Sequence, residues 1–581
     1  MALAPLLYFV RGLFMNHPII PIAVQGASRQ RKRQAPKGRR VDPQALTEVQ
    51  ALLGEHSRQA DLLIEYLHKI QDAYGCLSAQ HLAALAQEMK LAQAEVYEVA
   101  TFYHHFDVVK EGDAAPAALT VRVCDGLSCE MAGARELIER LPAMLGKEVR
   151  VIAAPCIGRC EQAPAAVVGQ HPVPHASCES IAAVVSNGDI THIPSDFVGL
   201  AEYRAAGGYA VLEECLAGTR DVESVIVTME NSGLRGLGGA GFPAGRKWRI
   251  VKAEAGPRLM AINIDEGEPG TFKDRHYLER DPHRFIEGAL IAAWVVDVTT
   301  IYVYLRDEYH GCRAILEEEL EKLRAHPLFE RMPRIILRRG AGAYICGEES
   351  AMIESIEGKR GMPRLRPPYV AQVGIFGLPT LQHNYETLHW VRDILERGPE
   401  LFAGSGRNGR KGLRSFSVSG RVREPGVKLA PAGITVQELI DEYCGGMAEG
   451  HTLYAYLPGG ASGGILPASL NHIPLDFDTL QPYGCFIGSA AVIVLSEHDT
   501  AAGAARNMLR FFREESCGQC TPCRVGTAKA VTLMEQPVWD TALLGELSQV
   551  MRDASICGLG QAAPNPFDCV IKYFPHELVT S

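Results

Sequence analysis

The sequence predicts a multidomain α/β protein. Its 581 residues exceed what one hydrophobic core usually supports and suggest about three to four domains. Segments with helical spacing lie near both ends of the chain, and strands alternate with helices between them, which is typical of α/β domains. Hydrophobic residues make up 47% of the chain and charged residues 22%, as in an ordinary soluble, folded protein.

Charge and hydropathy exclude two broad classes of function. The net charge is −10, so we expect no nucleic-acid binding, and the locally basic stretch 29–40 is expected to be a surface tail. The apolar N-terminal residues are interrupted by Arg11, His17 and prolines, and they offer only a weak signal-peptide pattern. No run reaches the length of a membrane-spanning helix. We therefore expect a cytoplasmic protein without a membrane span, preceded by a flexible N-terminal extension.

The chain divides into segments with different patterns. The first folded segment is helical, with Gly75 as a plausible helix end. Next comes a small α/β unit in which two strands each end on a cysteine, followed by a glycine-rich mixed α/β segment. A second small α/β unit with a hairpin and the helix TVQELIDEYCGG leads into a mainly helical end. The predicted segments are 1–42, 43–115, 116–195, 196–410, 411–497 and 498–581.

Two cysteine pairs follow the two strands of the first α/β unit. Cys124 and Cys129 lie in the loop CDGLSC, and Cys156 and Cys160 lie in PCIGRC. In a large chain without a clear signal peptide, such spacing indicates metal or redox chemistry rather than disulfides. Four thiolates suit a two-iron cluster or structural zinc, and the wide first gap favours iron–sulfur. Zinc and unliganded cysteines remain alternatives.

A more specific pattern, ESCGQCTPCR, lies near the C-terminus. Cys517, Cys520 and Cys523 match the three-cysteine run that wraps a [4Fe–4S] cluster, whose fourth ligand comes from a distant position. Cys557 and Cys569 are the downstream candidates. Cys557 is favoured because it lies among glycines, where backbone N–H groups approach a cluster closely. Zinc or simple packing is the alternative reading of the triplet.

Three loops in the segment 196–410 combine glycines with charged residues. They are SGLRGLGGAGFPAGRKW, NIDEGEPGTFKDR and GAGAYICGEES. The first exposes backbone N–H groups, with Lys247 adding positive charge, but it lacks a clear GxGxxG frame. Alone, each loop is compatible with a structural turn or with acids that favour a helix start. Together they predict a nucleotide or flavin pocket.

Over about 530 residues the chain resembles a known family. Its later part is similar to the flavin subunit of respiratory complex I and of soluble NAD-linked dehydrogenases, because the three loops, EGKRGMPRLRPP and ESCGQCTPCRVG occur in the family order. The earlier part, with VYEVATFYHHF and both cysteine loops, resembles the two-iron partner subunit. The resemblance implies a helical lead-in, a thioredoxin-like [2Fe–2S] domain, a Rossmann-like FMN/NADH domain, a ubiquitin-like (soluble-ligand-binding-type) domain and a helical [4Fe–4S] bundle.

The resemblance also implies the cofactor contacts. Cys124, Cys129, Cys156 and Cys160 would hold the [2Fe–2S] cluster, and Cys517, Cys520, Cys523 and Cys557 the [4Fe–4S] cluster. The residues implied to contact FMN are Gly236, Gly238, Lys247, Asn263, Asp265, Glu266, Gly347, Glu348 and Asn384. Those implied to contact NADH are Phe242, Glu268, Glu349, Arg366 and Tyr369.

Several positions depart from the family pattern. Leu237 stands where the family usually has arginine, so one charge near the phosphates is missing. Arg366 and Tyr369 replace lysine and phenylalanine and keep the charge and the ring. The usual Asn-Asn pair reads His383-Asn384, followed by Tyr385. We therefore favour Asn384 over His383 as a flavin contact.

The implied activity is that of an NADH dehydrogenase (diaphorase) subunit. Flavin exchanges a hydride with nicotinamide and single electrons with clusters, so we expect no side chain to act as a catalytic acid or base. Fusion of the two modules favours a soluble enzyme that needs a partner. The resemblance, including GGASGGILP, favours the β subunit of an NAD-dependent formate dehydrogenase, whose catalytic subunit carries molybdenum- or tungsten-pterin and further clusters. An NAD-reducing hydrogenase, a complex I-like peripheral arm and a non-catalytic zinc scaffold are the alternatives.

Overall fold

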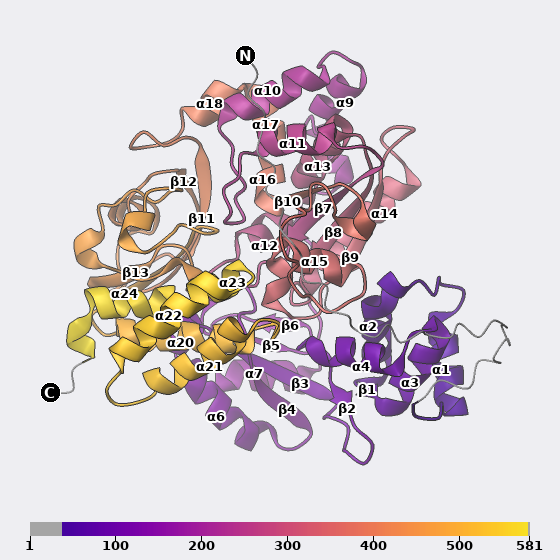
Figure 1. Ribbon diagram of the computed structural model, residues 1–581, viewed down its shortest axis with the longest axis horizontal. Helices are drawn as coiled ribbons and strands as arrows, with labels where there is room; N and C mark the ends of the chain where they lie inside the picture. Colours follow the sequence, from indigo (N-terminus) through magenta and orange to yellow (C-terminus); the bar gives the residue numbers. More distant parts are fainter. Residues whose placement is uncertain (1–37, 579–581) are drawn as a thin grey trace, which may run out of the picture. The chain divides into compact units, whose positions relative to one another are not determined.

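The computed structural model describes residues 38–578, and the chain from Val41 onward forms one compact unit (Figure 1). Most of the predicted N-terminal extension, 1–42, therefore lies outside the described residues. In the described part of the chain, no helix combines the length and apolar character needed to cross a membrane.

The first folded segment is helical, as predicted. Asp42 and Ser78 cap the first and third helices by accepting from backbone N–H groups one turn ahead. Gly75 ends the second helix in the left-handed conformation, as its position in the sequence indicated. A short parallel pair of strands closes the segment. The elements are α1 (Pro43–Leu53), α2 (Leu63–Tyr74), β1 (Leu77–Ser78), α3 (Ala79–Met89), α4 (Gln93–Phe102) and β2 (Val108–Val109).

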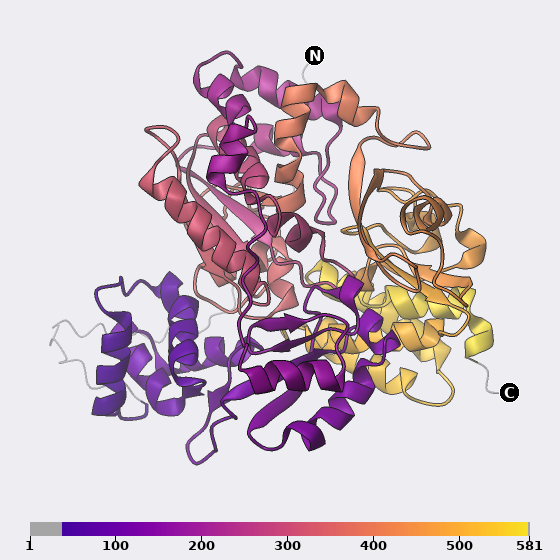
Figure 2. The same cartoon turned by 180° about the vertical axis from the view of Figure 1, so that it is seen from behind.

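The next segment is a four-stranded sheet in the order β4-β3-β5-β6 (Figure 2). Its first two strands run parallel, with Cys124 opposite Ala154, so both cysteine loops leave the sheet at the same edge. Helix α6 crosses between them and packs on the sheet, as predicted for a strand–helix–strand unit. The elements are β3 (Leu119–Cys124), α5 (Leu127–Met131), α6 (Ala134–Leu145), β4 (Val149–Ala154), β5 (Ala166–Val168), β6 (His171–Val173) and α7 (Cys178–Asn187).

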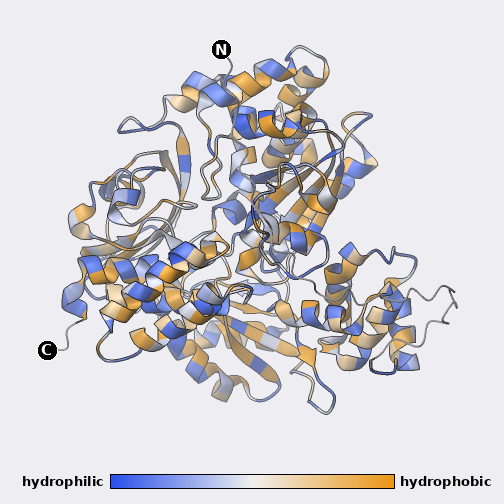
Figure 3. Cartoon of the chain, viewed as in Figure 1, coloured by the Kyte–Doolittle hydropathy of each residue, from blue (hydrophilic) through white to orange (hydrophobic). Residues whose placement is uncertain are grey.

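A parallel sheet in the order β10-β7-β8-β9 forms the centre of the third segment. The two central strands, β7 and β8, are largely apolar, as the hydropathy colours of Figure 3 show, and mostly buried, because parallel sheets are covered by helices on both faces; the outer strands β9 and β10 carry more polar residues. The strands are β7 (Arg258–Ile264), β8 (Val298–Leu305), β9 (Arg334–Arg339) and β10 (Thr380–Asn384). The helices before β8 are α8 (Leu200–Ala205), α9 (Ala210–Leu216), α10 (Val222–Ser232), α11 (Ala244–Ala253), α12 (Lys273–Leu278) and α13 (Pro282–Val296). Those after it are α14 (His310–Ala325), α15 (Glu349–Ile356), α16 (Tyr385–His389), α17 (Val391–Arg397) and α18 (Pro399–Ala403).

The fourth segment contains a five-stranded sheet in the order β12-β11-β15-β13-β14. The predicted hairpin is present as the antiparallel pair β11–β12, with Leu413 opposite Pro431. The predicted helix starts with a capping box between Thr435 and Glu438, but it continues as a π-helix turn, Leu439–Tyr443. The elements are β11 (Leu413–Gly420), β12 (Gly426–Pro431), α19 (Val436–Glu438), β13 (Leu453–Leu457), β14 (Leu466–Pro467) and β15 (Ala491–Ser496).

Helices make up the C-terminal segment, as predicted. α20 packs against α21 and α24, and α22 packs against α21 and α23. The helices are α20 (Ala501–Glu514), α21 (Thr521–Met534), α22 (Thr541–Ala554), α23 (Gly558–Ala562) and α24 (Asn565–Tyr573). The described chain therefore confirms the prediction of a multidomain α/β protein with helical segments near its two ends.

Candidate functional site

The carboxyl edge of the four-stranded parallel sheet carries the residues that sequence analysis selected. Asp265 follows β7, Gly340 follows β9, and Asn384 ends β10. In open parallel sheets, ligands bind in the crevice outside this edge. The structure thus brings all three glycine-rich loops toward one location, because GAGAYICGEES follows β9 and the first loop lies against Asn384.

Asp265 presents a buried acceptor that has no protein partner. Its Oδ2 atom makes no hydrogen bond, and burial raises its pKa well above the usual value. Asn263 fixes the surrounding backbone by donating to the Gly347 carbonyl at 2.9 Å and accepting from the Asp265 N–H at 2.8 Å. A Cβ on Gly347 would lie 3.1 Å from the Asp265 carbonyl oxygen. An unpaired buried oxygen beside a glycine fits a flat ligand with a hydrogen-bond donor.

The loop 233–243 folds as a tight turn against β10. Gly236 donates to the Phe242 carbonyl at 2.8 Å, and α11 begins just after the loop. A Cβ on Gly238 would lie 2.9 Å from the Cβ of Asn384, so the loop approaches the strand end as only glycine permits. Leu237 is buried, and its N–H donates to Thr387 at 3.0 Å. The side chain at position 237, where the family usually has arginine, is therefore part of the hydrophobic core in this protein.

Lys247 lies beneath the same strand. Its Nζ donates to the Gln382 carbonyl at 3.1 Å, and burial lowers its pKa. The neighbouring Trp248 donates its indole N–H to Nε2 of His383 at 2.7 Å, and burial holds the pKa of His383 well below the usual value. His383 is therefore neutral at pH 7 and anchored to α11.

Glu268 connects this edge to the fourth segment of the chain. The backbone N–H of Ser462 donates to its Oε1 at 2.8 Å, and the Ser462 hydroxyl donates to the same atom. Burial raises the pKa of Glu268 to about 7. A Cβ on Gly460 would lie 3.0 Å from the Glu268 carboxyl carbon. The GGASGG loop therefore closes over the second glycine-rich loop.

Charged and aromatic residues surround the opening of the site. Arg366 forms ion pairs with Glu348 at 2.5 Å and Glu349 at 3.0 Å, and Glu348 also caps α15. Tyr369 is 57% exposed and Phe242 is 37% exposed, although both are large and partly apolar. These residues are in reach of solvent and of a ligand, as residues that stack on a ring need to be.

Two predicted flavin contacts already have protein partners. Both carboxylate oxygens of Glu266 accept from the Asp274 N–H, and the Tyr309 hydroxyl donates to Oε2 at 2.9 Å. The Asn384 amide donates to Asp274 at 2.9 Å and accepts from the Glu386 N–H at 3.0 Å. Both side chains support the loop that follows β7, and their contact with a flavin stays a prediction.

The first four predicted cluster ligands lie together. Cys124 ends β3, Cys129 lies in α5, Cys156 follows β4, and Cys160 begins the short helical turn Cys160–Gln162, all of them buried. The sulfurs of Cys156 and Cys160 are 3.4 Å apart. The pKa of Cys156 lies well below the usual value because it accepts hydrogen bonds from the neighbouring thiols and faces Arg306. A lowered thiol pKa favours the thiolate that metals bind.

The loop of Cys156 and Cys160 packs against the third segment of the chain, which carries the candidate site. Arg306, directly after β8, donates to the Cys156 carbonyl at 2.6 Å, and Arg275 donates to the Gly158 carbonyl at 2.9 Å. A Cβ on Gly158 would collide with Tyr309, so glycine is required there. Sequence analysis did not select Arg306 or Tyr309, although Arg306 occupies the strand-end position that marks this kind of site.

The C-terminal cysteines converge in a second place. Cys517 and Cys520 lie between α20 and α21, Cys523 lies in the first turn of α21, and Cys557 precedes α23. A Cβ on Gly560, in α23 just after Cys557, would lie 2.9 Å from the Cβ of Cys523. Burial, with the thiol of Cys517 nearby, raises the pKa of Cys523 to about 11 and that of Cys557 to about 12. Cys569 lies elsewhere, with its sulfur 3.6 Å from that of Cys485. The geometry thus groups Cys557, not Cys569, with the triplet.

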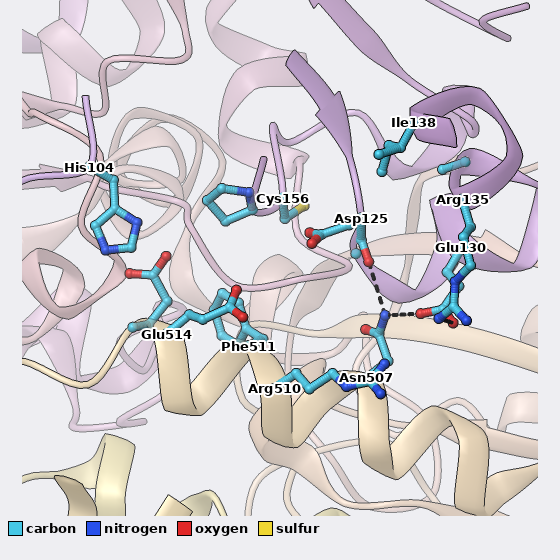
Figure 4. A pocket seen from close by; sticks show the side chains of 14 residues that line it. His104, Asp125, Glu130, Arg135, Ile138, Cys156, Asn507, Arg510, Phe511 and Glu514 are labelled. Atoms are coloured by element: carbon cyan, nitrogen blue, oxygen red, sulfur yellow. Dashed lines mark hydrogen bonds and ion pairs between the residues drawn. The ribbon is translucent and has the colours of Figure 1, made fainter. Parts of the chain in front are cut away.

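Glu515 joins the triplet loop to the third glycine-rich loop. Its Oε2 accepts from the Tyr344 N–H at 2.9 Å, and the Tyr344 ring packs against Phe511 with centroids 5.0 Å apart. A cavity of about 200 Å³ also lies between α20 and the first cysteine loops (Figure 4). Asn507 crosses it and donates to the Asp125 carbonyl at 2.9 Å. The candidate flavin site therefore contacts both cysteine sites.

Comparisons with known protein families match this organisation. A family described as "Nuo51 FMN-binding domain" matches residues 229–393, and "Thioredoxin-like [2Fe-2S] ferredoxin" matches 49–188. "NADH-ubiquinone oxidoreductase-F iron-sulfur binding region" matches 503–581, and "SLBB domain" matches 415–466. These matches confirm the predicted kinds of domain, FMN and both kinds of cluster.

Named relatives cover the later part of the chain. An NADH-quinone oxidoreductase component of Rhizobium meliloti is 39% identical over 396 residues, which is 65% of this chain and 93% of that protein. The mitochondrial NADH dehydrogenase [ubiquinone] flavoprotein 1 of Dictyostelium discoideum is 39% identical over 372 residues, which is 61% of this chain and 78% of that protein. The mitochondrial NADH-ubiquinone oxidoreductase 51 kDa subunit of Neurospora crassa is 39% identical over 374 residues, which is 61% of this chain and 76% of that protein.

A solved structure covers most of the chain. One chain of a NAD+-reducing [NiFe]-hydrogenase in the H2-reduced state is 32% identical, with a TM-score of 0.78. The match covers 90% of this chain and 92% of that one. The air-oxidised state of such a hydrogenase matches with a TM-score of 0.79.

The sulfur positions also fit clusters better than single ions. Among the described residues, the one group of three or more potential ligand atoms within 4.8 Å of one another belongs to His68, His105 and Asp307, and it contains no sulfur. A single tetrahedral zinc ion with bonds of about 2.3 Å would bring four sulfurs within roughly 3.8 Å of one another. The sulfurs of Cys156 and Cys160 lie 3.4 Å apart, as two ligands of one metal ion would, but no three cysteine sulfurs of the described residues lie within 4.8 Å of one another. Such pairing suits a cluster, whose ligands bind different iron atoms.

Proposed function

The chain belongs to the family of the flavoprotein subunits of NADH-quinone and NADH-ubiquinone oxidoreductases, and we propose that it exchanges electrons between NAD(H) and a partner subunit. It is an NAD-dependent oxidoreductase. The observation that supports the proposed electron route most is that one sheet edge, with an unpaired buried oxygen on Asp265, contacts both cysteine sites. Bound FMN supplies the chemistry that converts a two-electron hydride into single electrons.

The proposed cofactor contacts divide into a floor and an opening. Asn263, Asp265 and Gly347 form the floor, and the proposal assigns FMN to them together with Gly236, Gly238, Lys247 and Glu348. NADH is assigned to the opening, with Phe242 and Tyr369 offering ring faces and Arg366 offering charge. The role of these residues is to bind, orient and exclude water. No side chain needs to move a proton in the hydride step.

The proposed ligands of the clusters are the two convergent cysteine sets. Cys124, Cys129, Cys156 and Cys160 are assigned to [2Fe–2S], and Cys517, Cys520, Cys523 and Cys557 to [4Fe–4S]. Most of these positions are buried, which limits the access of water to the thiolates, and hydrogen bonds tie both sets to the flavin-site loops. Such proximity favours rapid electron exchange between them.

The proposed electron donor of the partner subunit is formate. The resemblance of GGASGGILP and of the fused architecture to the β subunits of NAD-dependent formate dehydrogenases supports this choice. The partner would carry a molybdenum- or tungsten-pterin and further iron–sulfur clusters. The proposed location is the cytoplasm, where NAD(H) is available.

Hydrogen is the second candidate, because a chain of a NAD+-reducing [NiFe]-hydrogenase matches this chain over nine-tenths of its length. Co-purification from the source organism, followed by NAD+ reduction assays with formate and with hydrogen, separates the two. NADH formation from hydrogen alone would replace the formate proposal with the hydrogenase one. Reduction by neither substrate would contradict both.

The diaphorase activity itself is tested on the purified chain. We expect a brown protein that releases fluorescent flavin on denaturation, contains about six iron atoms per chain and reduces a dye with NADH. A colourless, zinc-loaded protein without dye reduction would instead support the scaffold alternative.

A further inference from the structure

A pair of buried histidines lies apart from both cysteine sites, at the contact between the helical lead-in and the flavin-site segment. His68 belongs to α2 and is 2% exposed, and His105 lies in the connection after α4. Their ring centroids are 4.8 Å apart. Asp307, which follows β8, is buried beside them. One ligand atom from each of the three residues lies within 4.8 Å of the other two.

Each imidazole is held by one nitrogen and leaves the other without a partner. His68 donates its Nε2–H to the Gly340 carbonyl at 2.9 Å, because a carbonyl can only accept. His105 contacts Asp307 Oδ2 through Nδ1 at 2.6 Å. His68 Nδ1 and His105 Nε2 are buried and make no hydrogen bond. Both nitrogens are therefore left unsatisfied in a place where unpaired polar atoms are costly.

This pattern is the one that metal-binding histidines show. A ligating histidine usually donates its second N–H to a backbone carbonyl or a carboxylate, which fixes the tautomer and aims the free nitrogen at the ion. In His68 the second nitrogen bonds a backbone carbonyl, that of Gly340, and in His105 it bonds a carboxylate, that of Asp307. Burial lowers the pKa of His68 well below its usual value, so its ring is neutral and ready to bind.

The local charge is compatible with a cation. Arg339 pairs with Asp307 at 2.6 Å and with Asp72 at 2.6 Å, so two carboxylates oppose one guanidinium. Burial alone would raise the pKa of Asp307, but His105 and Arg339 hold it well below its usual value, and it is ionised. A groove of about 970 Å³, lined in part by His68, Asp72 and Arg339, offers a route for an ion.

We propose that His68 Nδ1 and His105 Nε2 bind one divalent transition-metal ion of the zinc type, with Asp307 holding the opposite nitrogen of His105 and water completing the coordination. Two imidazoles, one of them backed by a carboxylate, suit zinc in charge and in ligand type. The ion would tie α2 to the loop after β8. Because the backbone N–H of His105 also donates to the Ala341 carbonyl at 3.1 Å, the site would brace the third glycine-rich loop from behind.

The test is the zinc content of the intact holoenzyme. After incubation with Zn²⁺ and desalting, we expect about one zinc per chain in the wild type and less than about a fifth of that in His68→Gln and His105→Gln. His451→Gln is the matched control, since His451 also lies next to a second histidine, at 5.1 Å, but bonds Ser496 through Nδ1. Iron and FMN contents measured on the same samples show that the variants are folded.

X-ray absorption at the zinc edge identifies the ligands of the bound zinc in the wild-type protein, without any variant. Nitrogen and oxygen neighbours at about 2.0–2.1 Å, without sulfur, support the site. Sulfur neighbours at about 2.3 Å would assign the zinc to cysteines and overturn the proposal. It would be overturned equally by a wild-type protein that retains no zinc, or by histidine variants that retain as much zinc as the wild type.

Discussion

Arg306 donates to the carbonyl of Cys156, at 2.6 Å, across 150 residues of sequence. The same guanidinium reaches the Glu266 carbonyl and pairs with Glu308. Arg306 is 4% exposed, so its charge and the two carbonyls satisfy one another out of contact with water. One side chain thus fixes both the loop proposed to hold the two-iron cluster and the loop that follows β7.

Replacing Arg306 with leucine should destabilise the packing of these two loops more than most single substitutions would. It leaves two buried carbonyls without a donor, and losing one partner of a buried charged network typically costs about 3–5 kcal/mol. We expect a lower unfolding temperature and a reduced electron paramagnetic resonance signal from the [2Fe–2S] cluster, with the [4Fe–4S] signal retained. Arg249→Leu, at an exposed ion pair, is the control. Equal loss of both signals would contradict the local role of Arg306.

Glu268 should make stability depend on pH. Its pKa is raised from 4.5 to about 7 in the folded chain, chiefly by burial. Between these values the folded state holds a proton that the unfolded state has released. The contribution of Glu268 to the free energy of unfolding is therefore fully present below about pH 4.5 and is lost as pH rises through about 7. Thermal unfolding of wild type and Glu268→Gln between pH 5 and 8 tests this.

The variant should gain stability relative to the wild type as pH rises, by roughly 1–3 kcal/mol across this window, because glutamine has no charge to bury. Asp478→Asn is a suitable control, since Asp478 is exposed and paired with Arg235. A constant difference between wild type and Glu268→Gln over this pH range would show that Glu268 does not titrate as proposed.

Gly238 should be needed for flavin binding rather than for folding of the whole chain. An alanine there would place its Cβ 2.9 Å from the Cβ of Asn384, so the loop must move away from β10. We expect Gly238→Ala to lose most of its FMN while keeping the iron of both clusters, measured by flavin fluorescence and iron analysis. Gly545→Ala, where no atom lies within 4 Å of the new Cβ, should keep both. Full FMN occupancy in Gly238→Ala would show that this loop does not form part of the flavin site.

Local patterns were sufficient to predict the elements but not the contacts between them. Gly75 ends a helix, Cys124 ends a strand and Leu413 begins a hairpin, because turn chemistry and hydrophobic alternation act over a few residues. The kinds of domain and the cofactors were predicted from motifs that occur in the same order as in the known family. Residues that join the segments carry no such local signal. The Tyr344–Glu515 contact spans 171 residues, and the Ser462–Glu268 contact spans 194.

Sequence spacing offered two candidates, Cys557 and Cys569, for the fourth ligand of the [4Fe–4S] cluster. Cys557 precedes α23 next to the triplet, with the N–H groups of Leu559 and Gly560 hydrogen-bonded to it. Cys569 lies on α24 against Cys485 instead. We therefore expect Cys557→Ser to lose about four iron atoms per chain and Cys569→Ser to lose none.

Both variants should keep FMN and reduce a small dye with NADH, because neither cysteine makes the contacts that hold the glycine-rich loops, such as Asn263 to Gly347 and Tyr344 to Glu515. They should differ in electron transfer to the partner subunit, which requires a complete route through the cluster. NAD+ reduction by the assembled complex is therefore expected to fail in Cys557→Ser and to survive in Cys569→Ser. Full iron content and full activity in Cys557→Ser would instead require another ligand for this cluster.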